Sequence, residues 1–269
     1  MELDFVDRLE NLVPKPDGII IKDGVRCCDR CGDAVEATVE LYGEKITVPC
    51  ICTCGQTQLR QKELDERRLE IEQNRRTCFQ GTQMIKCNFE NDDRVNEKLS
   101  NAMRRYCDEF FSFFKQGKGL LLYGGTGTGK SYYAACIANE VISKGYSCLM
   151  TNFATIIGEL SDKQKSQEYM ASLERYSLLV IDDLGTESGS DYRKEIVFRV
   201  IDMRYRLKLP VIITTNLTMD EIGKTEDISY KRIYDRVLER CFPVKFEGMN
   251  HRRANIRQDY ETTKNILGL

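Results

Sequence analysis

A glycine-rich stretch that ends in lysine and serine is the part of this sequence best suited to bind a phosphate group. It follows the pattern G-x-x-x-x-G-K-S, over Gly124, Gly125, Thr126, Gly127, Thr128, Gly129, Lys130 and Ser131. Glycines let such a loop close on an anion, with backbone N–H groups and the positive end of the following helix directed at it. We therefore expect Lys130 to reach the β- and γ-phosphates of ATP and the Ser131 hydroxyl to bind Mg²⁺.

Two acidic residues end the apolar run LLVIDD, at positions 182 and 183. Asp182 is predicted to bind Mg²⁺ directly or through water, and Asp183 to orient or deprotonate the attacking water. An acidic pair after a strand can also serve only as a helix cap. Another apolar run, VIITTN, ends in Asn216. We expect the Asn216 side chain to hold the attacking water near the γ-phosphate, to cap the next segment, or to do both.

Arginine recurs at every fourth position in SYKRIYDRVLERC, at Arg232, Arg236 and Arg240. A helix would place these side chains on one face. One interpretation is a solvated face paired with Asp235 and Glu239. The other is an arginine finger, a guanidinium that enters the ATP site of a neighbouring subunit and offsets charge in the transition state. The second interpretation predicts a homo-oligomer with ATP between its subunits.

Six of the twelve cysteines fall within the first 55 residues, in CCDRCG and PCICTCG. Cys28 and Cys31 have the C-x-x-C spacing that presents two thiolates to one metal, and tetrahedral Zn²⁺ needs two more ligands. The candidates for these two ligands are Cys50, Cys52 and Cys54. We prefer the last two of this set, and Cys27 is a weaker alternative. Free thiols and an iron–sulfur cluster are the competing interpretations.

The elements that must position these residues alternate along the rest of the chain. Short apolar runs separated by helical stretches predict a parallel α/β sheet with five strands, at residues 119–124, 146–153, 177–183, 210–216 and 242–248. Residues 56–80 lack Gly and Pro and are dense in charge, which favours a linker helix with i,i+4 pairs. The later cysteines are scattered and are expected in or beside the core: Cys78, Cys87, Cys107, Cys136, Cys148 and Cys241.

Composition limits the kinds of protein that this chain can be. A net charge of −2 gives no overall basic field for nucleic acid, so any such contact needs a local patch. No apolar run approaches the roughly 18 residues that span a bilayer, and the acidic start MELDFVDRLE lacks the features of a signal peptide. We therefore expect a cytoplasmic protein without membrane contact, in a reducing compartment that favours metal binding over disulfides.

These motifs together resemble the AAA+ ATPases of the DnaC/DnaI helicase-loader and IstB group, over roughly residues 85–255. The segment CNFENDDRVNEKLSNAMRRYCDEF resembles the lead-in of that group, GLLLYGGTGTGKSYYAACIANEVISKG its Walker A region, and LLVIDDLGTE its Walker B region. By the same match RIYDRVLERC carries the arginine finger, with Arg236 first and Arg232 second. The stretch FEGMNHRRAN places a nucleotide-contacting basic residue at Arg252, and we regard the adjacent His251 as incidental.

The resemblance implies an α/β fold, an AAA+ P-loop NTPase with a five-stranded parallel sheet. A small cysteine-rich, zinc-ribbon-like domain for partner binding would occupy residues 1–55, a charged helical linker 56–84 and the ATPase domain 85–269. The chain departs from the general AAA+ pattern at Asp183, where Glu is usual. The shorter side chain predicts weak ATP hydrolysis without DNA or a partner, and Glu187 is a nearby acid that can assist.

The resemblance also implies a function. The chain would bind a replicative DNA helicase through its cysteine-rich domain and deposit it on single-stranded DNA during replication initiation. Candidate DNA contacts after the second strand are Phe153, Lys163 and Lys165, although an ordinary amphipathic helix explains the same residues. The alternatives are an IstB-type transposition helper that acts on duplex DNA and a nucleotide-regulated adaptor that hardly hydrolyses ATP. A metabolic P-loop kinase fits the order of the motifs poorly.

Overall fold

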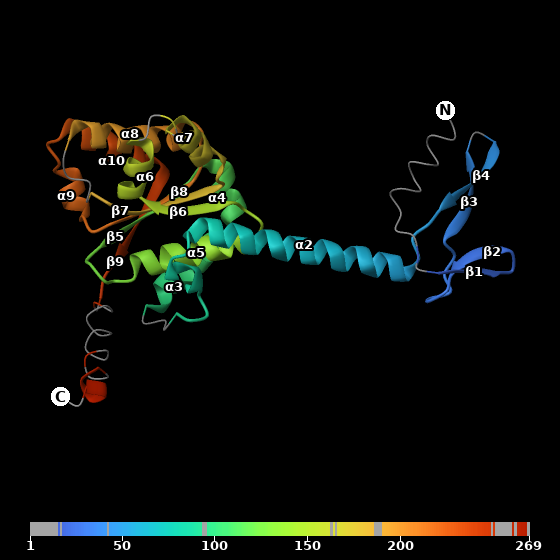
Figure 1. Ribbon diagram of the computed structural model, residues 1–269. Coiled ribbons are helices and arrows are strands. Elements are labelled where there is room, and N and C mark those ends of the chain that lie inside the picture. The colour runs from blue at the N-terminus through green and yellow to red at the C-terminus, as the bar shows by residue number, and fades with distance from the viewer. Residues whose placement is uncertain are drawn as a thin grey trace. The chain divides into compact units, whose positions relative to one another are not determined.

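The computed structural model describes residues 16, 18–41, 43–92, 96–161, 164, 166–185, 190–248, 250, 260 and 263–267 (Figure 1). The chain divides into two compact units, Met1–Glu70 and Ile71–Leu269, which are described separately. The division falls within the charged segment predicted to be a linker helix. Among the described residues, no helix has the length and apolar character needed to cross a membrane.

Two antiparallel hairpins form the first unit, from the strand pairs β1 (Ile19–Lys22) with β2 (Val25–Cys28) and β3 (Glu36–Leu41) with β4 (Glu44–Pro49). The first hairpin turns at Asp23 and Gly24, whose φ angles of 49° and 81° suit a two-residue type I′ turn. Most strand residues are exposed. Among the described residues of this unit, the buried core cluster consists of Cys28, Val35 and Cys52. A core this small leaves the unit in need of another source of stability.

Helix α2 (Thr53–Phe79) contains the charged segment predicted to be helical. Asp33 fixes its start, because the Asp33 carboxylate accepts hydrogen bonds from both the N–H and the hydroxyl of Thr53. These bonds favour the charged carboxylate and lower the pKa of Asp33. Every residue from 61 to 70 is exposed. Charged neighbours such as Lys62 and Glu66 pair along this stretch, which supports the helix in water.

The predicted sheet of five parallel strands is confirmed in the second unit, with β5 (Gly119–Gly124), β6 (Cys148–Asn152), β7 (Leu178–Leu184), β8 (Val211–Thr215) and β9 (Cys241–Phe246). The strand order is β6-β7-β8-β5-β9, and every neighbouring pair is parallel. Strand β5 leads into the glycine-rich loop, β7 carries the acidic pair, and Asn216 follows β8 directly. Because parallel strands place their carboxyl ends at one edge of a sheet, all three features meet there.

Helices cover both faces of this sheet (Figure 1). One face carries the end of α2 with the short helix η1 (Gln83–Lys86), α3 (Glu97–Asp108), α4 (Phe110–Gln116) and α5 (Lys130–Ser143). The other carries α6 (Phe153–Ser161), α7 (Ser166–Arg175), α8 (Asp191–Arg206), α9 (Met219–Gly223) and α10 (Ile228–Arg240). Alternation along β5 divides the two cores, since Leu120 and Leu122 join the first and Leu121 the second.

These two cores test two further predictions, one for the later cysteines and one for Phe153. Five of the later cysteines are buried and Cys87 is partly buried, as expected: Cys78, Cys107, Cys136, Cys148 and Cys241. Phe153 is only 1% exposed and packs in the core that α6 shares with β7 and α8. The prediction that Phe153 contacts DNA is therefore wrong, because a ring enclosed in this way has no face left for a base.

Candidate functional site

The phosphate-binding loop, residues 124–131, connects the end of β5 to the start of α5. At Gly124 φ is 134°, and a Cβ atom there would collide with the backbone oxygen of Phe246 in β9. At Gly127 φ is 76°, and a Cβ atom would collide with the side-chain oxygen of Asn250. Both positions need a left-handed or similarly rare backbone and a close approach to a neighbour, which only glycine permits.

Lys130 lies inside this loop and is only 5% exposed. Its ammonium group donates to the carbonyl oxygens of Gly124 and Gly125 at 2.8 and 2.7 Å, and to Oδ1 of Asn216 at 2.8 Å. These acceptors compensate for the loss of water around a buried cation. Thr128 helps to close the loop, since its hydroxyl donates to the Gly125 carbonyl at 2.9 Å. The loop thus holds a positive charge at the carboxyl edge of the sheet.

Three oxygen-bearing side chains meet beside the lysine. The Ser131 hydroxyl donates to Oδ1 of Asp182 at 2.7 Å, and the Thr214 hydroxyl donates to the same oxygen at 2.6 Å. Carboxylate and hydroxyl oxygens are the ligands that Mg²⁺ prefers, so Ser131 and Asp182 fit the predicted cation site. Thr214 was not predicted from the sequence. The only signal for it is the polar pair TT inside the otherwise apolar run VIITTN.

Asp183 has an unusual backbone and a fixed side chain. Its φ angle is 65°, and the register between β7 and β8 shifts between Ile181 and Leu184. Its N–H donates to the Thr214 hydroxyl at 2.9 Å, and its Oδ1 accepts from the Asn216 amide at 2.9 Å. Asn216 therefore joins the two halves of the site, accepting from Lys130 with its oxygen and donating to Asp183 with its nitrogen.

A buried aromatic cluster that was not predicted from the sequence lies beside the loop. The ring of Tyr133, in the first turn of α5, is 5.6 Å from that of Phe246 and 6.3 Å from that of Phe89, measured between centroids. The Tyr133 hydroxyl donates to the Asp92 carboxylate at 2.9 Å. This bond ties the segment before α3 to the helix that carries Lys130. The signal that would have found Tyr133 is its i+3 position from the loop lysine.

The three arginines of α10 lie on one face of the helix, as predicted, and contact α8. The guanidinium of Arg232 lies 4.5 Å from the centre of the Phe198 ring, and that of Arg236 lies 4.6 Å from the same ring. The Arg240 guanidinium lies 4.8 Å from the Tyr205 ring. The acidic partner of Arg236 is Asp202 of α8, at 2.8 Å, rather than the α10 residues Asp235 and Glu239 named in the sequence analysis.

Some predicted residues lie outside the part of the chain that the structure describes. These are Lys163, Lys165, Glu187, His251 and Arg252. The assignments of Arg252 to nucleotide contact, of the two lysines to DNA contact and of Glu187 to assistance in hydrolysis stay predictions. The residues that the sequence places in the loop, the acidic pair and the asparagine are brought together in one network.

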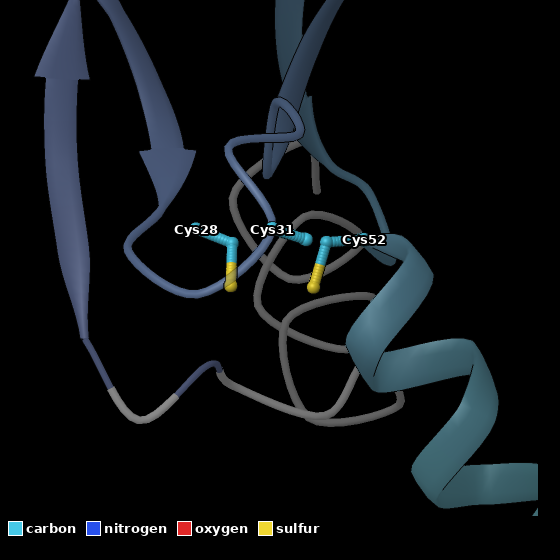
Figure 2. Close-up of side chains that lie close together, drawn as sticks. All are labelled: Cys28, Cys31 and Cys52. Carbon is cyan, nitrogen blue, oxygen red and sulfur yellow. The ribbon is translucent and has the colours of Figure 1, made fainter.

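A thiol cluster, Cys28, Cys31 and Cys52, is the candidate metal site in the first unit. The three sulfur atoms lie within 4.8 Å of one another. Figure 2 shows the three side chains side by side, between the turn that follows β2 and the start of α2. Tetrahedral zinc with Zn–S bonds of about 2.3 Å places its sulfur ligands roughly 3.8 Å apart, so the cluster fits Zn²⁺ after small adjustments.

The neighbouring cysteines differ in how they relate to this cluster. A hydrogen bond between Cys31 and Cys54 raises the pKa of the Cys54 thiol to about 11. Cys54 is partly buried and packs against the core cluster that contains Cys28 and Cys52. Cys27 instead directs its thiol to the carbonyl of Val25, at 3.6 Å. Cys50 is held through its backbone N–H, which donates to the carbonyl of Val35. This arrangement favours Cys54 as the fourth ligand over Cys27 and Cys50.

Comparison with known proteins adds evidence independent of this geometry. The family described as IstB-like ATP binding protein matches residues 62–259. The replicative helicase loader DnaI of Bacillus subtilis is 28% identical over 174 residues, 59% of this chain and 56% of that protein. The replicative helicase loader DnaC of Escherichia coli strain K12 is 32% identical over 163 residues, 56% of this chain and 62% of that protein. The chain thus spans less than two thirds of either relative.

The fold comparison agrees. A crystal structure of DnaI superimposes with a TM-score of 0.53 and 26% identity, over 62% of this chain and 91% of that one. The resemblance to AAA+ ATPases inferred from the motifs is confirmed. This chain belongs to the family of IstB-like ATP binding proteins and is homologous to the DnaC and DnaI helicase loaders.

Proposed function

We propose that this chain is an ATP-dependent loader that binds a replicative DNA helicase and deposits it on single-stranded DNA during replication initiation. The observation that carries the proposal is the network of Lys130, Asn216, Asp183, Thr214 and Asp182 at the sheet edge, in a chain homologous to two proteins named replicative helicase loaders. We place its action in the cytoplasm, with no membrane contact.

ATP would bind with its phosphates in the loop of residues 124–131. Phosphate oxygens would then take over the Lys130 contacts now made by loop carbonyls, because the negatively charged phosphate adds ion-pair attraction to the hydrogen bond. Ser131 and Asp182 would hold Mg²⁺, which supplies charge neutralisation at the phosphates.

Hydrolysis would use the other half of the network. Asp183 and Asn216 would orient a water molecule that attacks the γ-phosphorus, and the bond to the β–γ bridging oxygen breaks to leave ADP and inorganic phosphate. The proton lost from the water would pass to the Asp183 carboxylate. Because Asp is one methylene shorter than Glu, we expect slow turnover until DNA or a partner adjusts the site.

A second copy of the chain would complete the site. We propose that ATP-bound subunits assemble with one another, or on the helicase, so that Arg236 of one subunit contacts the ATP of the next. Arg232 is the second candidate, and Arg252 would contact the nucleotide within its own subunit. ATP binding would favour the assembled state that grips single-stranded DNA, and hydrolysis would release it.

The first unit would serve as the helicase contact. Four thiolates from Cys28, Cys31, Cys52 and Cys54 would hold one Zn²⁺, which supplies folding energy to a unit with a small core. Each ligand is deprotonated on metal binding, so affinity for the metal should fall as the pH is lowered.

The test is capture of replicative helicases from the source organism by the full chain, with ATP, with ADP and without nucleotide. We expect capture that depends on ATP, is reduced by Lys130→Ala and is reduced by the double change Cys28→Ser, Cys31→Ser. The control Cys27→Ser should capture helicase normally. Capture of no helicase under any of these conditions would contradict the loader function.

A transposition helper is the second candidate, because the matching family is named for IstB-like proteins. It predicts ATP-dependent binding to duplex DNA without helicase capture, measurable on the same protein by filter binding. An adaptor with little hydrolysis is kept open by Asp183, and it predicts helicase capture with no ATP turnover even when single-stranded DNA is present.

A further inference from the structure

We infer that Asp202 positions Arg236 as the arginine that one subunit presents to the ATP site of the next. Asp202 lies on α8 and Arg236 on α10, two helices packed on the same face of the sheet. The inference rests on the proposed function, because it requires an ATP site shared between subunits. It adds a positioning residue for which none of the sequence motifs gave a signal.

Two arginines hold the Asp202 carboxylate from both sides. Oδ1 accepts from Nε of Arg236 at 2.8 Å, and Oδ2 pairs with Nε of Arg206 at 2.9 Å. The Asp202 side chain is only 16% exposed, against 72% for that of Arg206. A carboxylate engaged at both oxygens and shielded from water has a fixed orientation. It can therefore fix the orientation of the arginine bound to it.

The contact with Asp202 leaves the two terminal nitrogens of the Arg236 guanidinium available to bind phosphate. A guanidinium has five N–H groups, one on Nε and four on the two terminal nitrogens. Asp202 takes the Nε group, and it is the only hydrogen-bond partner of Arg236 among the residues that the structure describes. The two terminal nitrogens are the pair that matches two phosphate oxygens. Asp202 thus fixes Arg236 through Nε and leaves the two terminal nitrogens available to a ligand.

Aromatic rings restrict the same guanidinium. It lies 4.6 Å from the centre of the Phe198 ring and 5.6 Å from that of Tyr205. Tyr205 is itself held, since its hydroxyl donates to the Glu239 carboxylate at 2.9 Å. Cation–π contact and the ion pair act on different parts of the group, so Arg236 keeps one conformation before any partner arrives.

Arg232 lacks this support. Its guanidinium contacts the Phe198 ring at 4.5 Å, but its side chain is exposed and has no acidic partner within the described part of the chain. A long exposed side chain must lose more conformational freedom on binding than one already held in place. This contrast favours Arg236 as the residue presented to the neighbouring subunit.

The test mixes two variants that fail for different reasons. Asp202→Asn should keep ATP affinity but lose at least tenfold of the hydrolysis stimulated by single-stranded oligothymidine, as Arg236→Ala should. Lys130→Ala should bind ATP too weakly to hydrolyse it but keeps an intact Arg236. An equimolar mixture of Asp202→Asn with Lys130→Ala should hydrolyse several times faster than the sum of the two alone, because Arg236 from one variant serves the ATP site of the other.

The matched control is Asp235→Asn, which removes the same charge from an exposed position next to Arg236 and should stay within twofold of the unmutated protein. Thermal unfolding checks that each variant is folded. If Asp202→Asn does not fold, Asp202→Glu replaces it. That change keeps the charge but displaces the carboxylate by one methylene, and the same loss and rescue are expected.

Four outcomes would overturn the inference or the shared ATP site that it requires. Stimulated hydrolysis by folded Asp202→Asn within twofold of the unmutated protein would show that Arg236 needs no such support. Rescue of Arg236→Ala but not of Asp202→Asn by Lys130→Ala would assign Asp202 to its own chain and leave the proposed function standing. Full activity of Arg236→Ala, or no hydrolysis by the unmutated protein, would instead overturn the shared ATP site itself.

Discussion

The carboxyl edge of the sheet and the thiol cluster hold their functional atoms by different means. At the sheet edge, three strands buried on both faces fix the backbone. Without a ligand, Lys130 donates to Asn216 and Ser131 donates to Asp182. In the first unit the core cluster is Cys28, Val35 and Cys52, so two of the three core side chains are also the proposed metal ligands.

The two sites therefore obtain their order from different sources. The nucleotide site is preorganised by packing, and a ligand would mainly exchange partners within it. Packing among the described residues is not enough to order the thiol cluster, because two of the proposed metal ligands, Cys28 and Cys52, are also two of its three core side chains. Removal of the nucleotide should therefore leave the sheet edge folded, whereas removal of the metal should unfold the thiol cluster.

Metal removal should have the largest effect and should be confined to the first unit. Structural Zn²⁺ contributes about 10–16 kcal/mol of apparent binding energy in small domains, far more than a core of three residues can replace. The double change Cys28→Ser, Cys31→Ser should release about one metal per chain and abolish the hydrogen-exchange protection of β1 to β4. Protection of the second unit should not change.

Cys27→Ser is the control for that prediction, because Cys27 adjoins the cluster in sequence but directs its thiol to the Val25 carbonyl. It should keep its metal and its protection. Equal metal content in the double variant and the unmutated protein, measured by atomic emission, would contradict the zinc assignment. Iron in place of zinc would contradict it in favour of the iron–sulfur alternative.

Lys130→Ala should have the next largest effect. Loss of a charge-assisted donor in an enclosed site costs about 3–4 kcal/mol, so ATP affinity should fall by about 100-fold to 1000-fold. The fold should persist, because the sheet edge is held by many other contacts. Titration calorimetry measures the affinity, and circular dichroism checks the fold. Lys224→Ala, at an exposed position after α9, is the charge-matched control. Unchanged ATP affinity in Lys130→Ala would contradict the assignment of the phosphate-binding loop.

Thr214→Val should affect turnover more than binding. Valine keeps the shape of threonine but removes the hydroxyl that donates to Asp182 and accepts from the N–H of Asp183. An unmade buried hydrogen bond costs about 1–3 kcal/mol, so hydrolysis should fall about tenfold to 100-fold while ATP affinity changes less than about threefold. Thr151→Val is the control, since the Thr151 hydroxyl is also buried at the end of a parallel strand but donates a long bond, 3.5 Å, to the Asn152 carbonyl of its own strand. Equal turnover in the two variants would remove Thr214 from the site.

The sequence predicts the two regions unequally well, for physical reasons. The loop glycines, Lys130 and Asp182 are recognisable because phosphate binding needs fixed residue types at fixed spacing along one segment. Thr214 and Asp202 are not, because their roles depend on which strands and helices become neighbours. In the first unit, the C-x-x-C spacing identifies Cys28 and Cys31, whereas the choice between Cys50, Cys52 and Cys54 depends on where the chain enters α2. Phe153 misled because its sequence context does not reveal which face of α6 is buried.

Asp183→Glu should have the smallest effect and the opposite sign. The added methylene brings the carboxylate closer to an attacking water, and we expect hydrolysis to rise about threefold to tenfold, equivalent to roughly 1 kcal/mol in the barrier. The gain is limited by the backbone, since φ at this residue is 65° and Asp tolerates that region better than Glu. The variant should therefore also unfold a few degrees lower.

The control is Asp182→Glu, which adds the same methylene to the carboxylate that Ser131 and Thr214 hold. There the longer side chain should push the carboxylate out of its two hydrogen bonds and lower hydrolysis. Opposite responses at adjacent aspartates would show that residue 182 acts at a fixed distance and residue 183 acts across a gap that Asp does not fully span. A fall in turnover at both would mean that the packed sheet edge is already matched to Asp183, and that slow hydrolysis must originate elsewhere in the assembly.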